Sequence, residues 1–187
     1  MALKAVIFDM DGLMLDTERI ALIGWKHGAK ELGIDISDEF MHKAIGMNKQ
    51  SMRELYYSAY NDKIPFETLH ERSRDKILDI IDKQGIGLKQ GLLPLLDYLD
   101  ITGIRKAVGT STSSAGARRN LTKAGILDRF EVLACGDEVE NGKPAPDIFL
   151  LAAKRLNLRP DECIVLEDSE NGVRAAYAAG IRVIVVP

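Results

Sequence analysis

The chain is poor in cysteine, and its cysteines form no metal-binding pattern. Cys135 and Cys163 are the only two among 187 residues, and each lies within or beside an apolar run. No spacing of cysteine and histidine is typical of a zinc site. Both cysteines are therefore expected to be reduced thiols in the core.

An excess of charge and a clustered basic surface are missing as well. The 25 basic residues nearly balance the 28 acidic ones, which gives a net charge of −3, and no basic run interleaved with aromatic residues is present. These features argue against a nucleic-acid polymer as a partner.

Long hydrophobic runs are also lacking. The apolar stretch near the N-terminus is short and soon ends in acidic residues, unlike a signal peptide, and no run approaches the length that crosses a membrane. We therefore expect a cytoplasmic protein with no membrane partner.

The chain does contain enough apolar sequence for a real core, since 46% of its residues are hydrophobic. Short apolar runs alternate with helical patterns over its second half. This alternation predicts an α/β fold built on a Rossmann-like parallel sheet. The expected strands are residues 4–8, 106–110, 131–134, 163–166 and 182–186.

A different pattern separates the first expected strand from the second. Helical periodicity dominates there, and no run rich in β-forming residues occurs. Leu22 and Trp25 begin an apolar stripe at helical spacing, which Gly33 ends as a C-terminal stop. We therefore predict a core domain of residues 1–15 and 88–187 and an inserted helical domain of residues 16–87.

The most informative stretch is the first apolar run with the acids that follow it. Asp9 and Asp11 are alternate residues, so they project to one side where the strand ends. Two carboxylates this close repel each other unless a metal or a phosphate site uses them. The alternative is a polar turn that closes the strand, with Gly12 supplying a positive φ.

Two further segments carry groups that bind anions. Thr110 ends the second expected strand and Ser111 follows it, and hydroxyls at the start of a helix form a cradle for phosphate. The alternative is that this cluster only caps the helix, through Ser113 or Ser114. Lys143 precedes a proline, which biases its backbone to an extended shape just before a helix. The alternative for Lys143 is a solvated surface lysine.

The fourth expected strand ends in Glu167 and Asp168, which alternatively cap the next helix. Because open α/β sheets bind ligands at the carboxyl ends of their strands, these polar groups should converge. Together they have the makeup of a phosphoryl-transfer site. It needs a carboxylate nucleophile, a second carboxyl for proton transfer, a hydroxyl and a lysine for phosphate oxygens, and acids for Mg²⁺.

On these residues the sequence resembles the phosphohydrolases of the haloacid dehalogenase superfamily, and the resemblance covers nearly the whole chain. The subgroup includes β-phosphoglucomutase, phosphoglycolate phosphatase and pseudouridine-monophosphatase-like enzymes. The resemblance implies that Asp9 is the nucleophile, that Asp11 is its acid/base, and that Thr110, Ser111 and Lys143 bind the phosphate. The Mg²⁺ ligands that it implies are Asp9, Glu167, Asp168 and the backbone carbonyl of Asp11.

In the resembled subgroup, a helical insertion after the first motif is a cap that closes over the site, excludes water and reads the leaving group. We expect the same of the inserted domain here. Residues 44–50 are the expected substrate-facing loop, in which Lys49 contacts an anionic or hydroxylated substrate. The three histidines are assigned no role.

The resemblance implies a Mg²⁺-dependent phosphatase that hydrolyses a small phosphomonoester through an aspartyl phosphate, the substrate being a sugar phosphate, phosphoglycolate or a nucleotide-like compound. The alternative is a sugar phosphomutase like β-phosphoglucomutase. A histidine of the mutase pattern is missing between Thr17 and Ala21, and Lys49 replaces its arginine, which favours hydrolysis. A receiver domain that accepts phosphate on aspartate is less favoured, because of Asp11 and the large cap.

We expect a monomer. The chain ends at Pro187, just after the last expected strand, whereas the resembled proteins run on through a further strand and helix. A fragment and a shortened core are both open as explanations, and either predicts an exposed sheet edge.

Overall fold

Five parallel strands form the centre of the molecule. A computed structural model describes residues 3–44, 47, 49–60 and 64–186. The sheet has the order β3-β2-β1-β4-β5, and every neighbouring pair is parallel. The predicted parallel sheet is thus confirmed, with each strand within one residue of its expected bounds. The strands are β1 (Ala5–Phe8), β2 (Arg105–Thr110), β3 (Val132–Cys135), β4 (Cys163–Glu167) and β5 (Arg182–Val185).

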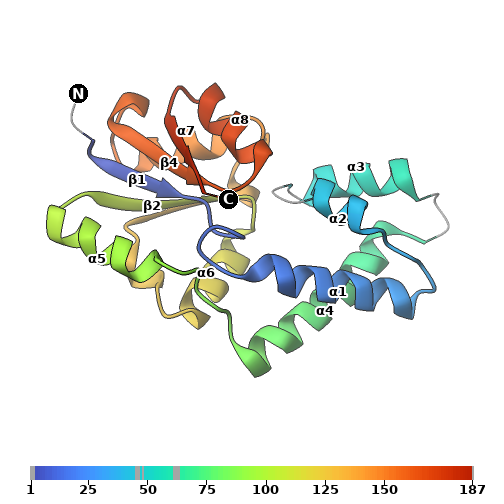
Figure 1. The fold of residues 1–187 in the computed structure, drawn as a ribbon. Coiled ribbons are helices and arrows are strands. Elements are labelled where there is room, and N and C mark those ends of the chain that lie inside the picture. Colours follow the sequence, from blue (N-terminus) through green and yellow to red (C-terminus); the bar gives the residue numbers. More distant parts are fainter. Residues whose placement is uncertain (1–2, 45–46, 48, 61–63, 187) are drawn as a thin grey trace.

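Helices cover both faces of this sheet (Figure 1). Val6 and Phe8 of β1 pack in one apolar cluster with α5 and α6, and Ile7 packs in the opposite cluster with α7 and α8. β1 is therefore buried on both sides, and each such side chain contributes about 1.5–3 kcal/mol by leaving water. The helices are α5 (Leu92–Thr102), α6 (Ser114–Lys123), α7 (Asp147–Arg155) and α8 (Glu170–Ala178), with short 3₁₀ turns η1 (Leu127–Arg129), η2 (Gly136–Glu138) and η3 (Pro160–Glu162) between them.

The two edges of the sheet differ. Along β3, Arg155 donates to the carbonyl of Leu133, and Glu138 accepts from the amide of Cys135 at 2.9 Å, so side chains occupy the backbone groups of that edge. β5 lies at the opposite edge, where Ile184 is 49% exposed. The exposed edge of the described sheet is therefore β5.

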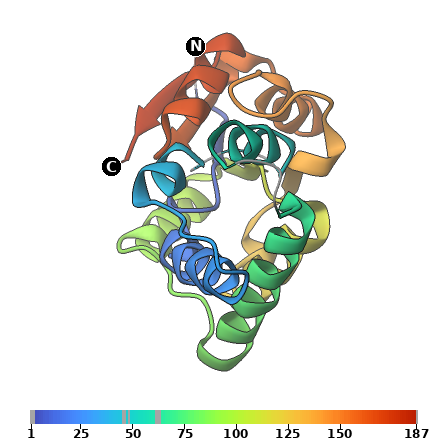
Figure 2. The ribbon, with the colours of Figure 1, turned by 90° about the vertical axis from the view of Figure 1, so that its right-hand side faces the viewer.

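The segment between β1 and β2 is helical, and its helices form a group beyond the carboxyl ends of the strands (Figure 1, Figure 2). Their own core is aromatic, with Trp25 and Phe66 stacked at 5.9 Å between ring centroids. Gly33 follows the first helix with φ at 68°, which fits the predicted stop. No helix in the described part of the chain is both long and apolar enough to cross a bilayer. The four helices are α1 (Thr17–Glu31), α2 (Asp38–Ala44), α3 (Lys49–Ala59) and α4 (Phe66–Gln84).

Two connecting segments join these helices to the core, and they lie side by side. Leu15 and Leu88 form an antiparallel bridge, and the amide of Asp16 donates to the carbonyl of Gly87 at 2.9 Å. The first helix therefore starts a few residues from Asp11, at a point fixed to the return segment.

α1 and α4 approach closely at Gly28. A Cβ at that position would lie 2.6 Å from Oγ and 2.8 Å from the backbone nitrogen of Ser73. Gly28→Ala is therefore expected to destabilise the protein, because overpacking costs about 1–3 kcal/mol, whereas the gain in helix propensity returns at most about 1 kcal/mol. The free energy of unfolding in urea measures this loss.

The matched control is Gly87→Ala, whose Cβ would meet only the Cβ of Asp16, at 3.8 Å. Its stability is expected to stay near that of the parent chain. Equal stability of the Gly28 and Gly87 variants would contradict the close helix contact.

Candidate active site

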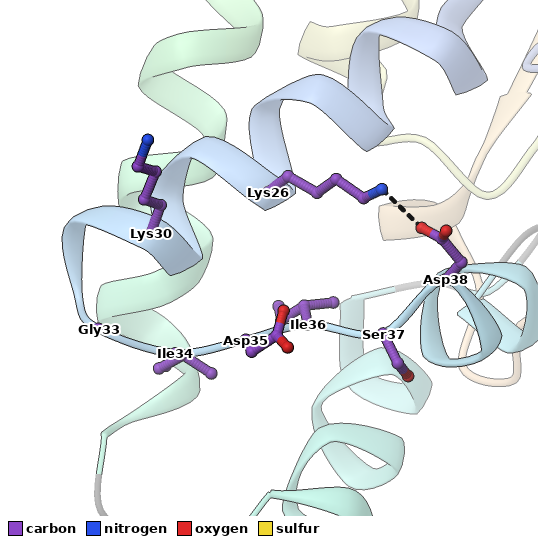
Figure 3. Close-up of a pocket in the computed structure, with 8 residues that line it drawn as sticks. All are labelled: Lys26, Lys30, Gly33, Ile34, Asp35, Ile36, Ser37 and Asp38. Carbon is purple, nitrogen blue, oxygen red and sulfur yellow. Dashed lines mark ion pairs between the residues drawn. The ribbon is translucent and has the colours of Figure 1, made fainter.

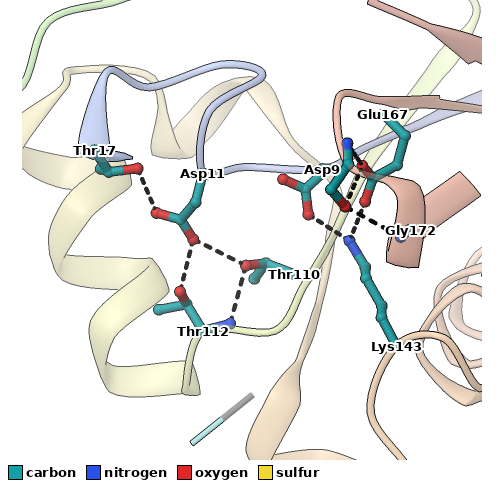
Figure 4. A network of polar contacts seen from close by, with 9 residues as sticks. Asp9, Asp11, Thr17, Thr110, Thr112, Lys143, Glu167 and Gly172 are labelled. Carbon is teal, nitrogen blue, oxygen red and sulfur yellow. Dashed lines mark hydrogen bonds and ion pairs between the residues drawn. The ribbon is translucent and has the colours of Figure 1, made fainter. Parts of the chain in front are cut away.

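The predicted polar groups meet at the carboxyl edge of the sheet. Asp9 follows β1, Thr110 ends β2, Glu167 ends β4, and Lys143 comes from the loop before α7. Figure 4 shows Asp9, Lys143 and Glu167 directed toward one another from separate elements, with Thr110 directed toward Asp11 beside them. Parallel strands bring their ends to one edge, so the convergence follows from the sheet topology.

Lys143 lies at the centre of the site. Its Nζ donates to Oδ1 of Asp9 and, at 2.6 Å, to Oε1 of Glu167 (Figure 4). The residue is only 2% exposed, so it is not the solvated surface lysine of the alternative interpretation. Burial disfavours the ammonium, but Asp9 and Glu167 outweigh this and raise the pKa of Lys143 above its ordinary value.

Asp9 is the second buried member of this group, with an exposed fraction of 7%. Burial raises the pKa of its carboxyl well above the ordinary value, the ammonium of Lys143 opposes that rise, and the charge of Glu167 adds to it. One lysine therefore balances only one of two adjacent carboxylates, and a further positive charge would stabilise the pair.

Glu167 is fully buried and rigidly held. Its Oε2 accepts from the amide of Ser169 at 2.8 Å and from the hydroxyl of Ser169 at 3.0 Å. A Cβ on Gly172 would lie 1.6 Å from Oε1 of Glu167, so only glycine fits there. Ser169 itself caps α8 by accepting from the amide of Gly172, so the helix cap does not account for Glu167 or Asp168.

Carboxylate oxygens of Asp9, Glu167 and Asp168 lie within 4.8 Å of one another. Burial raises the pKa of Asp168 to about 7, and the charges of Glu167 and Glu18 add to the shift. A set of hard oxygen donors with excess negative charge suits a divalent cation such as Mg²⁺. These three residues therefore fit the predicted metal.

The carboxylate of Asp11 lies apart from those oxygens and is bound by threonine hydroxyls. It accepts from Thr17 at 2.7 Å, from Thr112 at 2.7 Å and from Thr110 at 3.3 Å (Figure 4). The two acids of the first motif thus have separate environments. The polar turn of the alternative interpretation is also present, because Gly12 has a positive φ of 87°. The turn and the group of polar side chains therefore occur together.

Thr17 and Thr112 are site residues that the sequence interpretation missed. The run of three hydroxyls from Thr110 to Thr112 was a signal for the second of them. Ser111, between them, is half-buried. Ser113 caps α6 by accepting from the amide of Gly116, so the predicted cap and the predicted phosphate hydroxyls are different residues of one loop.

The predicted substrate loop is placed only in part. Lys49 is the first residue of α3 and is exposed, whereas Ile45, Gly46 and Asn48 lie outside the described residues. Within the described residues, no hydrogen bond or ion pair joins Lys49 to Asp9, Asp11 or Lys143. Its contact with a substrate stays a prediction.

A hollow of about 600 Å³ lies elsewhere, between the end of α1 and the segment that leads to α2 (Figure 3). The ammonium of Lys26 pairs with Asp38 across it at 2.6 Å. It contains none of the predicted site residues, so the candidate active site rests on the strand ends alone. The hollow is lined by Lys26, Lys30, Gly33, Ile34, Asp35, Ile36, Ser37 and Asp38.

Comparisons with known proteins cover nearly all of the chain. Residues 6–186 match the sequence model of the haloacid dehalogenase-like hydrolases. The phosphorylated carbohydrates phosphatase of Thermotoga maritima is 31% identical over 182 residues, which are 96% of this chain and 82% of that protein. β-Phosphoglucomutase of Bacillus subtilis is 31% identical over 185 residues, 96% of this chain and 81% of that one.

A solved structure agrees with these sequence matches. The crystal structure of CbbY from Rhodobacter sphaeroides in complex with phosphate aligns with a TM-score of 0.84 and 29% identity. The alignment covers 99% of this chain and 86% of that one.

Proposed function

Because the chain belongs to the haloacid dehalogenase-like hydrolase family, we propose that it is a phosphatase that hydrolyses a small phosphomonoester through an aspartyl phosphate on Asp9. Candidate substrates are a sugar phosphate, phosphoglycolate or a nucleotide-like compound. The observation that carries the proposal is the separation of two acids, with Asp9 buried against Lys143 and Asp11 held by threonines.

Asp9 acts as the nucleophile. Its carboxylate attacks the phosphorus of the bound ester, a P–O bond to the carboxylate forms, and the P–O bond to the leaving alcohol breaks. Burial and the contact with Lys143 fix the direction of this carboxylate, because its Oδ1 is already bound by the ammonium. A fixed nucleophile needs little reorganisation before attack.

Lys143, Thr110 and Ser111 bind the phosphoryl oxygens. The ammonium of Lys143 is buried between two carboxylates, so it is kept charged and cannot turn to solvent. A buried cation of this kind offsets the charge that gathers on the equatorial oxygens during transfer. Asp9, Glu167, Asp168 and the backbone carbonyl of Asp11 would hold Mg²⁺, which supplies further charge stabilisation at those oxygens when bound.

Asp11 carries the proton. It gives a proton to the departing alkoxide, and later takes one from the water that attacks the phosphorus and restores Asp9. Its three hydroxyl partners orient the carboxyl without neutralising it. One of these partners, Thr17, begins α1, so the orientation of Asp11 depends on where the inserted helices start.

A phosphomutase is the second candidate, and the similarity to B. subtilis β-phosphoglucomutase favours it. That reaction would pass the phosphoryl group from Asp9 to a second sugar hydroxyl instead of water. The missing histidine between Thr17 and Ala21 and the lysine at position 49 favour hydrolysis.

Metal removal tests the proposal directly. The chain, freed of metal by a chelator, would be assayed for phosphate release from a hexose phosphate, phosphoglycolate and a nucleoside monophosphate, with and without added MgCl₂. Release is expected only with the metal present, because three adjacent carboxylates otherwise repel the phosphoryl group.

The outcomes separate the candidates. Phosphate release that persists in excess chelator would contradict the Mg²⁺ requirement. Interconversion of hexose phosphates without any phosphate release would favour the mutase.

A further inference from the structure

A fourth carboxylate lies beside the proposed metal ligands, and the inserted helices supply it. Glu18 is in the first turn of α1, next to Thr17, and is half-buried. The other acidic residues of the site, in contrast, lie at the ends of β1 and β4 or directly after them. Glu18 had no place in the function proposed above.

Gly12 shows where this carboxylate is directed. A Cβ at Gly12 would lie 2.0 Å from Oδ2 of Asp168 and 3.0 Å from Oε1 of Glu18. Both carboxylates therefore converge on the same small space above Gly12, which is open only because that residue has no side chain. The positive φ of Gly12 also disfavours any other residue there.

In the part of the chain that the structure describes, no cation balances the charge of Glu18. Within the described residues, the Glu18 carboxylate forms no hydrogen bond or ion pair. The nearest basic residue in sequence, Arg19, donates to Asp16 at 2.9 Å, and Lys143 is bound to Asp9 and Glu167. Two carboxylates that approach each other without a cation are mutually destabilising.

An ordinary structural role of Glu18 explains its place in the helix but not the direction of its carboxylate. An acidic residue in the first turn of a helix interacts favourably with the helix dipole. That interaction is satisfied by a carboxylate pointing into solvent, and it gives no reason for Glu18 to face Asp168. A hydrated cation between the two carboxylates does give such a reason.

We propose that Glu18 accepts hydrogen bonds from the water bound to the metal that Asp9 and Asp168 hold. This inference rests on the proposed function and adds to it a metal-positioning residue from the inserted helices. Mg²⁺ usually keeps several of its waters in protein sites, and carboxylates that bind such waters tune the affinity for the metal. Metal binding and the position of the first turn of α1 are thereby coupled.

Calorimetric titration of the metal-free chain with MgCl₂ tests this without turnover. Glu18→Gln is expected to weaken Mg²⁺ binding about tenfold or more, as is typical when a group that supports the ligands is removed. Glu31→Gln, which changes an exposed acid at the other end of the same helix, is the matched control and should bind Mg²⁺ like the parent chain.

Thermal unfolding supplies a second readout. Without metal, Glu18→Gln should be as stable as the parent chain or more stable, because a repulsion is removed, whereas the stabilisation by Mg²⁺ should be smaller.

Two further variants make the result decisive. Asp168→Asn should abolish Mg²⁺ binding; if it does and Glu18→Gln binds normally, the role of Glu18 is overturned while the proposed function stands. Parent-like binding by Asp168→Asn would overturn the metal site itself and the inference with it. Glu18→Asp keeps the charge but withdraws the carboxylate, so parent-like affinity in this variant would show that charge alone suffices and would overturn the contact through water.

Discussion

Asp9→Asn is expected to lower phosphate release by at least about four orders of magnitude, since an amide cannot form the aspartyl phosphate. The fold should survive, because the buried group of Asp9, Glu167 and Lys143 carries two negative charges and one positive charge. Asparagine would leave Lys143 paired with Glu167, so no buried charge would lack a partner. Steady-state phosphate release and thermal unfolding, measured on the same preparation, test both statements.

The control for this variant is Asp128→Asn, which changes an exposed acid in η1, between α6 and β3 and outside the site. Its activity and stability should match those of the parent chain. Activity of the Asp9 variant near that of the control would remove Asp9 from the role of nucleophile. A folded but inactive Asp9 variant would leave the assignment standing.

Local sequence predicted the sheet because its strands are short apolar runs that end abruptly in polar residues. Val6, Ile7 and Phe8 are followed at once by Asp9, and the same change marks the end of β4 at Glu167. Parallel topology then determines that these ends share one edge. Asp9, Lys143 and Glu167 are buried together because of that topology. No single motif in the sequence indicates this joint burial.

Contacts that join the inserted helices to the core were not predictable in this way. Thr17 binds Asp11, and Glu18 faces Asp168, only because α1 starts at a particular position and angle. Helical periodicity places such residues on a helix but does not orient the helix relative to a sheet. The contact between Thr112 and Asp11 spans about a hundred residues of sequence, and it too depends on the tertiary arrangement.

The separation of Asp9 from Asp11 has a consequence for the chemistry. The carboxyl of Asp11 touches only hydroxyls in the described structure, and these hold it without a formal charge. Asp11 therefore has no cation in direct contact within the described residues, whereas Oδ1 of Asp9 accepts a hydrogen bond from the ammonium of Lys143. In the proposed mechanism, one motif thus supplies two acids with different functions, because their neighbours differ.

Asp11→Asn is accordingly expected to lower steady-state turnover by about 10²–10⁴-fold, the usual contribution of general acid–base catalysis. An ester with a leaving group that needs no proton, such as p-nitrophenyl phosphate, should still phosphorylate Asp9. The intermediate should then accumulate, because no base activates the water that removes it. Rapid-quench measurement of p-nitrophenol release, with mass spectrometry of the peptide containing Asp9, detects this state.

The leaving group distinguishes a chemical role of Asp11 from a structural one. If the variant only lost its contacts with the hydroxyls, Thr110 and Thr112 would be displaced. Both the initial burst of alcohol release and the steady-state rate of hydrolysis would then fall for every ester. A chemical role predicts a burst close to that of the parent chain with p-nitrophenyl phosphate and a much smaller one with an alkyl phosphate, whose alkoxide needs a proton. Asp35→Asn, an exposed acid at the far end of the inserted helices, serves as the control. Steady-state hydrolysis by Asp11→Asn at the rate of this control would assign the proton transfer to another group.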